Sequence, residues 1–317
     1  MYYEQQKAAE LEQKILPQTK KADFEEFWKA QVEALRKIPL QCTREKLDLP
    51  YEKTFITYKL TYNTHDDTMI DAYFCCPANS EGKKLPCVVR YHGGSGKKEI
   101  YADIMATGVC CLAMDVRAQG GTTVDRAVYH SGDRNGTLMT CGALDKNEFY
   151  MRNIYLDAVR AMDVAAQLPE VDPERIVTYG GSQGGALSIV ASTLSGLSKK
   201  CYAVVTSYAC LHQRVESPNP TRSGIFEHLH SFLRLYPEHT DTVMDVLTYF
   251  DVNNMVSLLK TPISFCLGLT DPVCLPEFVY SVYSHVPGEK EMHMYPFTPH
   301  ALPEAYKLMV HREFAAL

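Results

Sequence analysis

The spacing of apolar residues along the chain predicts an α/β domain. Short apolar runs, rich in β-branched and aromatic side chains, alternate with segments whose apolar residues recur at helical spacing. Runs of this kind suit parallel strands that are buried on both faces. We expect such strands at residues 86–91, 108–115, 175–179, 203–207, 263–269 and 292–295. The alternation predicts a mostly parallel, doubly wound sheet with helices between the strands.

The chain before these strands shows two other patterns. Residues 54–62 and 68–76 alternate like the two strands of a hairpin around residues 63–67. Further upstream, a helix is expected to begin at residues 23–26, to end near Pro39 and to pack on the main body. The apolar face of this helix comprises Phe24, Phe27, Trp28, Val32 and Leu35.

The motif Gly-Gly-Ser-Gln-Gly at residues 180–184 carries the most chemical information. A strand-like run precedes it and an apolar helical segment, residues 186–191, follows it. Strand, sharp turn and helix in this order predict a nucleophile elbow, in which Ser182 sits at strained dihedral angles at the helix N-terminus. A glycine-rich turn that binds phosphate is the alternative, but no Lys-Ser/Thr pair follows and the spacing is not G-x-G-x-x-G.

Composition excludes several other classes of protein. A net charge of -6 and a pI near 6.0 give no electrostatic case for binding nucleic acid or an anionic membrane. The start of the chain does not read as a secretory signal, and no apolar run approaches the roughly 20 residues of a membrane span, so we expect a cytoplasmic protein. The 11 cysteines include no C-x-x-C pair, and several lie inside apolar runs. We interpret them as reduced core residues rather than disulfides or a zinc site.

A serine nucleophile needs a base and an acid that orients the base, and in elbow-type hydrolases the acid and then the base follow the serine. Asp271 comes directly after the predicted strand 263–269, so its carboxylate should emerge at the carboxyl edge of the sheet. His300 lies in a loop just past the last predicted strand. The sequence therefore predicts Ser182, Asp271 and His300 as the triad. The non-catalytic alternatives are that Asp271 only forms an Asp-Pro turn and that His300 is a solvated loop residue. His285, His293 and His311 fall in helical or strand patterns and are expected to be structural.

Two backbone N–H groups should hold the oxyanion that forms during acyl transfer. The first belongs to Gln183, which follows the nucleophile. The second should come from the glycine-rich loop after residues 86–91, where the N–H of Tyr91 or of its neighbour is the expected donor, and Tyr91 is also expected to contact the substrate. A plain strand-ending turn would explain these glycines equally well. His92 precedes the serine and is expected to have a structural or pocket role.

These residues resemble the acetyl xylan esterase and cephalosporin C deacetylase family, carbohydrate esterase family 7. The most specific part joins Tyr-Leu-Asp-Ala-Val-Arg, within residues 150–160, to the Gly-Ser-Gln-Gly of the elbow. The resemblance extends over residues 24–28, 91–93, 115–121, 150–185, 249–252 and 269–274. It implies an α/β-hydrolase fold, the triad Ser182, Asp271 and His300, and an oxyanion hole made by the N–H groups of Tyr91 and Gln183.

The resemblance also implies an organisation for the chain. We expect one α/β-hydrolase domain over residues 1–317, with a helical extension at 1–45, an irregular insertion at 118–147 and a helical, cap-like segment at 217–254. Family members form hexamers whose active sites face an interior cavity, so residues 118–147 are the candidate subunit contact. Two residues depart from the family pattern: Ala118 stands where the family has glycine, and Ala301 stands where it has glutamate.

The expected activity is removal of acetyl groups from small acetylated sugars or cephalosporin C through an acetyl-enzyme. Water then hydrolyses this intermediate, and no metal or organic cofactor is expected because side chains and water complete the proton chemistry. A broad carboxylesterase, a lactone hydrolase or a peptidase could use the same triad. A non-catalytic carbohydrate-binding or scaffolding relative is the alternative from another class.

Overall fold

The computed structural model describes residues 2–80, 82–132, 138–217 and 227–317. Within them the chain forms a nine-stranded sheet with the order β1-β2-β3-β5-β4-β6-β7-β8-β9. The strands are β1 (Cys42–Lys46), β2 (Phe55–Asn63), β3 (Met69–Pro77), β4 (Leu85–Tyr91), β5 (Cys110–Met114), β6 (Val171–Gly181), β7 (Cys201–Val204), β8 (Ile263–Gly268) and β9 (Lys290–Tyr295). Strands β4 to β9 pair in parallel, whereas β1, β2 and β3 join antiparallel at one side. The predicted mostly parallel sheet is confirmed.

Each of the six expected parallel strands is present, and the hairpin forms as β2 and β3. Strand β6 begins and ends beyond its expected bounds, and at β7 residues 205–207 leave the strand because Val205 turns to a φ of 39°. Strand β1 was not predicted. It is polar and mostly exposed, so its sequence carries no apolar alternation, and it joins the edge of the sheet through its pairing with β2 alone.

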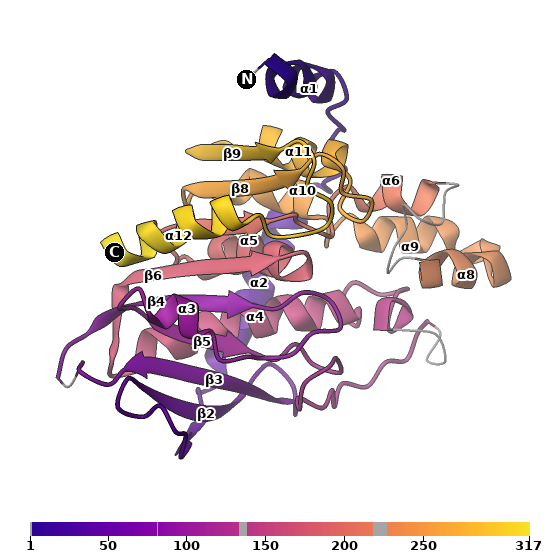
Figure 1. Cartoon of the computed structure of the whole chain (residues 1–317). Helices are drawn as coiled ribbons and strands as arrows, with labels where there is room; N and C mark the ends of the chain where they lie inside the picture. Colours follow the sequence, from indigo (N-terminus) through magenta and orange to yellow (C-terminus); the bar gives the residue numbers. More distant parts are fainter. Residues whose placement is uncertain (1, 81, 133–137, 218–226) are drawn as a thin grey trace.

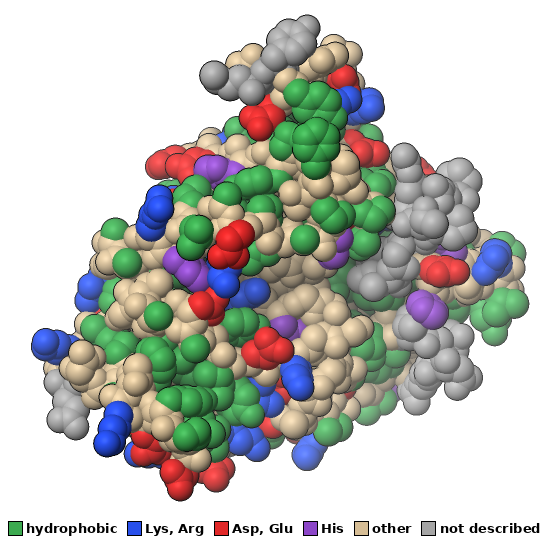
Figure 2. Space-filling model, in the orientation of Figure 1, with side chains coloured by type: hydrophobic (Ala, Val, Ile, Leu, Met, Phe, Trp, Pro, Cys, Tyr) green, Lys and Arg blue, Asp and Glu red, His purple; other side chains and the backbone are tan. Residues whose placement is uncertain are grey.

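Helices flank both faces of the sheet (Figure 1). They are α1 (Tyr2–Glu12), α2 (Phe24–Lys37), α3 (Ala102–Met105), α4 (Tyr150–Gln167), α5 (Gln183–Ser195), α6 (Leu211–Glu216), α8 (Glu227–Leu235), α9 (Thr240–Leu247), α10 (Val252–Met255), α11 (Pro276–Ser284) and α12 (Glu304–Ala316), with short 3-10 turns at Leu138–Thr140, Pro237–His239 and Val256–Leu258. Helices α2, α4 and α5 pack together on one face, and α3 and α12 lie on the other. No helix among the described residues is long and apolar enough to cross a membrane. On the face in Figure 2, acidic and basic side chains are interspersed.

The apolar face predicted for the N-terminal helix is buried as expected in α2. Trp28 at its centre is fully buried, and its indole Nε1 donates a hydrogen bond to the carbonyl of Tyr249 at 2.9 Å. The ring also packs edge-on against Phe250 and lies tilted over Tyr155. The helix therefore anchors the N-terminal segment to the main core.

The predicted insertion and cap-like segment are only partly described. Residues 133–137 of the first and residues 218–226 of the second lie outside the described residues. The described part of 118–147 contains only the short turn Leu138–Thr140 as regular structure, whereas the described part of 217–254 is mainly helical. The division of the chain into these units remains a prediction.

A buried cluster of charges fixes the loop that follows β5. Arg117 has no exposed surface, and its guanidinium donates to both carboxylate oxygens of Asp157 on α4, at 2.7 and 2.8 Å. It also donates to Asp66 in the β2–β3 turn, at 2.7 Å, and to Asp125, at 3.1 Å. Burial alone would raise the pKa of Asp66, but hydrogen bonds and the charge of Arg117 outweigh burial and lower this pKa to about 2. The Arg117 guanidinium thus connects the β2–β3 turn, helix α4 and the loop after β5.

Removing this cation should destabilise the fold strongly. We expect Arg117→Ala to lower the free energy of unfolding by about 3–5 kcal/mol, because it leaves the buried Asp157 without a counter-charge. The measurement is urea denaturation. The matched control is Lys199→Ala, which removes an exposed ion pair with Glu174 and should cost no more than about 1 kcal/mol. An equal loss of unfolding free energy in the two variants would contradict a stabilising role of the buried ion pair.

Candidate active site

Ser182 lies on the sharp turn between the end of β6 and the start of α5. Its φ of 57° and ψ of -120° lie in a region that costs a non-glycine residue of order 1–3 kcal/mol. The surroundings hold it there: its N–H donates to Val204 at 2.9 Å, and its carbonyl accepts from Ser207 and Gly185 at 3.1 and 3.0 Å. Strand, turn and helix follow in the predicted order, and the side chain is partly exposed.

The glycines around Ser182 allow an unusually close approach of helix and strands. A Cβ on Gly180 would overlap the backbone of Gly184, and a Cβ on Gly184 would overlap the carbonyl of Tyr91. Helix α5 therefore begins in direct backbone contact with β6 and β4. The two glycines thus allow the helix and the strands to pack this closely.

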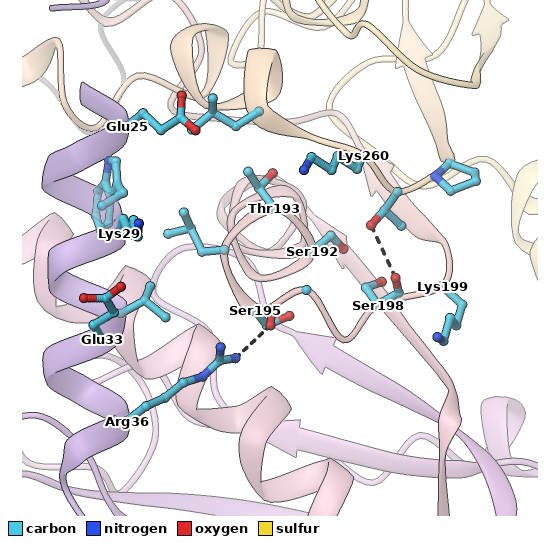
Figure 3. Close-up of a pocket in the computed structure, with 17 residues that line it drawn as sticks. Glu25, Lys29, Glu33, Arg36, Ser192, Thr193, Ser195, Ser198, Lys199 and Lys260 are labelled. Atoms are coloured by element: carbon cyan, nitrogen blue, oxygen red, sulfur yellow. Dashed lines mark hydrogen bonds between the residues drawn. The ribbon is translucent and has the colours of Figure 1, made fainter. Parts of the chain in front are cut away.

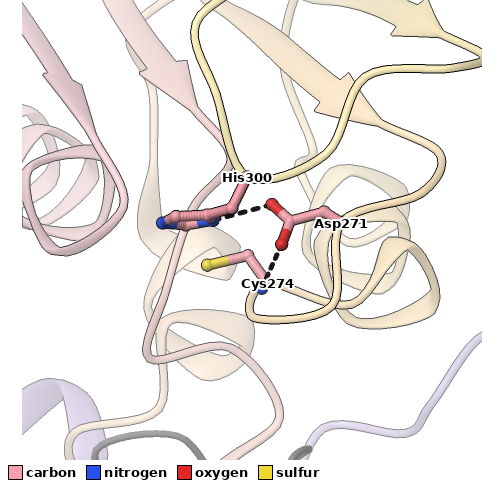
Figure 4. A group of neighbouring side chains, drawn as sticks. All are labelled: Asp271, Cys274 and His300. Atoms are coloured by element: carbon pink, nitrogen blue, oxygen red, sulfur yellow. Dashed lines mark hydrogen bonds and ion pairs between the residues drawn. The ribbon is translucent and has the colours of Figure 1, made fainter.

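The structure brings Asp271 and His300 together. Asp271 follows β8 and is almost fully buried, and His300 lies in the loop between β9 and α12. The Nδ1 atom of His300 lies 2.8 Å from Oδ2 of Asp271, while Oδ1 accepts from the backbone N–H groups of Val273 and Cys274 at 2.8 and 2.9 Å (Figure 4). The carboxylate is thus fixed on both oxygens, and it is aimed at the imidazole.

Ser182, Asp271 and His300 follow the carboxyl ends of the parallel strands β6, β8 and β9. Among the described residues, no hydrogen bond joins Oγ of Ser182 to His300. Such contacts commonly tighten only when a substrate is bound.

The environment of His300 favours its charged form. The hydrogen bond to Asp271 is the largest cause that raises the pKa of His300 above its ordinary value, followed by the contact with the Cys274 thiol, while partial burial opposes both. A base in this position is strengthened, because the proton that it accepts is stabilised by the buried carboxylate. This is the electrostatic requirement for an imidazole that takes a proton from a serine.

The prediction that Tyr91 contacts substrate is wrong. Tyr91 is the last residue of β4 and has no exposed surface, and its hydroxyl donates to the carbonyl of Ala158 on α4 at 2.8 Å. In the loop that follows, Gly93 is partly exposed and Gly94 and Ser95 are exposed, and a Cβ placed on Gly93 would lie 3.8 Å from Cβ of Ser182. The Tyr91 side chain is therefore not available to a substrate, whereas the role of the Tyr91 N–H as an oxyanion donor stays a prediction.

His92 holds this loop in place. Its Nε2 accepts the N–H of Val116 at 2.9 Å, so the proton sits on Nδ1, which donates to the carbonyl of Gly93 at 2.8 Å. The ring is neutral in this arrangement and nearly buried. The structure agrees with the expected structural role of His92.

Two glutamine side chains connect the loops around the nucleophile, a feature that sequence reasoning missed. The amides of Gln119 and Gln183 donate to each other at 2.8 and 3.0 Å. Gln119 also accepts the N–H of Ser95 at 2.9 Å, and Gln183 accepts the hydroxyl of Tyr208 at 2.7 Å. This glutamine network joins the loops that follow β4, β5 and β7 to the start of α5. Its only sequence signal was that Gln119 and Gln183 both fall within the segments that resemble the family.

A cavity of about 520 Å³ opens beside the elbow. This volume is typical of a site for a small molecule. It is lined by Gly94, Ser95, Ala118, Gln119, Gly120, Leu138, Met139, Tyr150, Gln183, Tyr208 and His228. The cavity thus borders both Gln183 and the exposed loop after β4.

A second cavity, of about 660 Å³, lies between α2 and the other end of α5 (Figure 3). Charged side chains of α2 line it, including Glu25, Lys29 and Arg36, and Arg36 donates to the carbonyl of Ser195 at 2.7 Å. Helix α5 separates it from Ser182 by about 20 Å, the length of 13 helical residues. None of the three predicted triad residues lines either cavity, but the first borders Gln183, the residue next to Ser182.

The comparisons with known proteins agree with this geometry. A family model for acetyl xylan esterases matches residues 8–315. The chain belongs to the acetyl xylan esterase family. It is 29% identical to the acetyl esterase Axe7A of Xylanibacter ruminicola over 295 residues, which cover 90% of this chain and 65% of that protein. The chain thus spans slightly less than two thirds of the length of this curated relative.

Solved structures of the acetyl xylan esterase family match nearly the whole chain. The acetyl xylan esterase from Paenibacillus sp. R4 superposes with a TM-score of 0.89 at 31% identity, covering 97% of this chain and 98% of that one. Acetyl xylan esterase 1 from Thermoanaerobacterium sp. JW/SL YS485 gives a TM-score of 0.88 at 24% identity over the same shares. The predicted family and the α/β-hydrolase fold are both confirmed.

Ala118, which by the family resemblance stands at a glycine position, adopts a left-handed conformation with a φ of 57°. Its exposed Cβ borders the cavity beside the elbow, and its N–H donates to Thr123 at 3.0 Å. A left-handed alanine costs roughly 1–2 kcal/mol, and glycine avoids this cost. The substitution therefore stores backbone strain next to the glutamine network.

We expect Ala118→Gly to stabilise the protein by up to about 1 kcal/mol, because relief of strain exceeds the extra chain entropy of glycine in the unfolded state. Urea denaturation measures the change. The converse control is Gly196→Ala at the end of α5, where φ is 70° and the added Cβ meets no neighbour, so strain alone should lower stability. A less stable Ala118→Gly variant would show that the alanine is not strained.

The raised pKa of His300 also has a testable consequence for pH. His300 must be neutral to accept a proton, so the acid limb of kcat/KM should lie above pH 6.5, the ordinary pKa of the group. Asp271→Asn should move this limb to lower pH and reduce kcat by roughly 10⁴-fold. The pair should stabilise the fold fully below about pH 6.5 and lose this contribution as the pH rises through the folded-state pKa of His300. An unchanged or upward shift of the acid limb in the variant would contradict this assignment.

Proposed function

We propose that the protein is a serine acetyl esterase that removes acetyl groups from small acetylated carbohydrates. The observation that carries the proposal is Ser182 on a strained elbow at the same edge of the sheet as the hydrogen-bonded pair of Asp271 and His300. Membership of the acetyl xylan esterase family supports the choice of ester. The cavity beside Gln183 has a volume that can hold a small substrate.

In the proposed mechanism, His300 takes the proton of Ser182 while Oγ attacks the acetyl carbonyl. Asp271 holds the imidazole in one orientation and stabilises the imidazolium. The alcohol leaves with the proton from His300, and water then attacks the acetyl-enzyme with His300 again acting as base. The bonds formed and broken are those of two successive acyl transfers, with no redox step.

The oxyanion is proposed to accept hydrogen bonds from Gln183 and from the Gly93–Gly94 backbone. Gln183 is the first residue of α5, so its N–H has no acceptor within the helix. The loop of Gly93 is held by His92 and by the N–H of Gly96, which donates to the Gly93 carbonyl at 3.0 Å. Donors fixed before the reaction need no reorganisation when charge develops.

Finer parts of the proposal are a preference for acetylated xylo-oligosaccharides or cephalosporin C-like esters, a cytoplasmic location and a homohexamer. The acetyl xylan esterases among the similar proteins support the first of these by their names. The hexamer and the subunit contact at residues 118–147 derive from the family resemblance alone.

The test compares the wild type with Ser182→Ala on acetylated xylo-oligosaccharides, cephalosporin C and a longer-chain p-nitrophenyl ester. We expect acetyl-selective release of acetate, and a loss of at least roughly 10³-fold in the variant. Ser188→Ala is the matched control, because this serine lies on the same helix but donates to the carbonyl of Gly184 at 2.8 Å.

The remaining outcomes separate the alternatives. A preference for longer acyl chains would indicate a general carboxylesterase. Absence of turnover that depends on Ser182, together with no labelling by a serine-reactive phosphonate, would indicate a binding or scaffold protein.

A further inference from the structure

Cys274 places a third metal-binding side chain beside the Asp271–His300 pair. One donor atom from each of Asp271, Cys274 and His300 lies within 4.8 Å of the other two. Figure 4 shows the thiol pointing toward the imidazole from the loop that carries Asp271. The Cys274 N–H bonds to Asp271 at 2.9 Å, so the backbone fixes the position of the thiol relative to the carboxylate.

The accessibility of these groups allows a small ion to enter. Cys274 has no exposed surface, and the Asp271 side chain has none either. The His300 side chain, however, is 29% exposed, which leaves a route from solvent to one side of the cluster.

The donor set is the one that zinc prefers. Thiolate, imidazole and carboxylate are its usual ligands, at about 2.3, 2.0–2.1 and 2.0–2.2 Å. Two donors on one tetrahedral ion then lie about 3.3–3.5 Å apart. The 2.8 Å separation of His300 and Asp271 needs to open by only about half an ångström, since the ion takes the place of the proton that the two groups share.

We propose that Asp271, Cys274 and His300 form an inhibitory site for thiophilic divalent cations, with Zn²⁺ as the principal case. On binding, the thiol of Cys274 loses its proton to solvent and forms the metal–sulfur bond, and an imidazolium at His300 loses one further proton. The metal occupies Nδ1 of His300, so the remaining ring proton sits on Nε2. The imidazole then has no lone pair with which to accept the proton of Ser182.

Inhibition rests on the proposed esterase function, whereas metal binding does not. Hard cations should not act at this site, because Mg²⁺ and Ca²⁺ select oxygen ligands and a thiol contributes little to them. Affinity for Zn²⁺ should rise with pH, since binding releases protons. Within the part of the chain that the structure describes, no second cluster of three such side chains meets the same geometry.

The first experiment measures inhibition of ester hydrolysis by Zn²⁺ and Mg²⁺, with each variant compared with its own metal-free rate. We expect Zn²⁺ to inhibit the wild type, and Cys274→Ser to weaken the inhibition constant by roughly 100-fold. Cys42→Ser is the matched control, because it removes an exposed thiol far along the chain from the cluster and should leave the inhibition constant unchanged. Equal inhibition of the wild type and Cys274→Ser, or equal potency of Mg²⁺, would overturn the proposal.

The second experiment detects the metal directly by the charge-transfer absorption of a Co²⁺–thiolate bond. The band should form with the wild type and with Ser182→Ala, and should be lost in Cys274→Ser. His300→Asn provides an independent test if the Cys274 variant does not fold, and it should weaken Co²⁺ binding. A band in Ser182→Ala together with no esterase activity in the wild type would uphold the metal site and refute the proposed function. No band in the wild type would refute the metal site.

Discussion

The close approach of α5 to β4 and β6 is the constraint on which the active-site architecture depends. Gly180 and Gly184 leave no side chain between the helix and the strands, so the first turn of α5 rests on the carbonyl of Tyr91. With both neighbours fixed, the connecting residue must adopt the strained conformation of Ser182. The same approach brings the loop after β4 alongside the nucleophile, because Tyr91 is the residue from which that loop departs. Helix packing, nucleophile geometry and the position of the exposed glycines are therefore consequences of one contact.

Electrostatics then order a segment that has little secondary structure. The loop after β5 begins at Asp115, a buried carboxylate that accepts from the N–H and the ammonium group of Lys98, at 2.5 and 2.6 Å. Two residues later, Arg117 reaches the carboxylates of Asp157 and Asp66. These contacts replace the backbone ladder that a helix or strand would supply. They also place Gln119 within hydrogen-bond distance of Gln183. The glutamine network therefore depends on the ion pairs that hold the loop after β5.

The sequence predicted the features that depend on local pattern. Buried parallel strands appear as continuous apolar runs, and the elbow has a fixed order of glycines and serine. Acidic or basic residues that follow parallel strands meet at one edge of the sheet, so their proximity can be predicted from the strand order. The pairing of Asp271 with His300 could therefore be predicted from the sequence. The substrate contact predicted for Tyr91 is wrong because the sequence pattern does not show that this side chain, at the end of β4, is buried against α4. Strand β1 was missed because an exposed polar edge strand lacks an apolar signature. The glutamine network depends on side chains brought together by tertiary packing, which no spacing encodes.

The position of His300 has a consequence for how the protein loses function. Ser182 follows β6, which lies between β4 and β7, but His300 follows β9, the terminal strand of the sheet, whose one partner among the described strands is β8. Most of β9 is only half-buried, and outer elements of this kind open at lower free energy than a central strand. The stacking of Tyr3 from α1 on Phe297, in the same loop as His300, adds one contact between the chain's first helix and that edge. His300, the proposed base, would thus separate from Ser182 through fraying of the sheet edge, and heat inactivation would follow this subglobal opening rather than melting of the core.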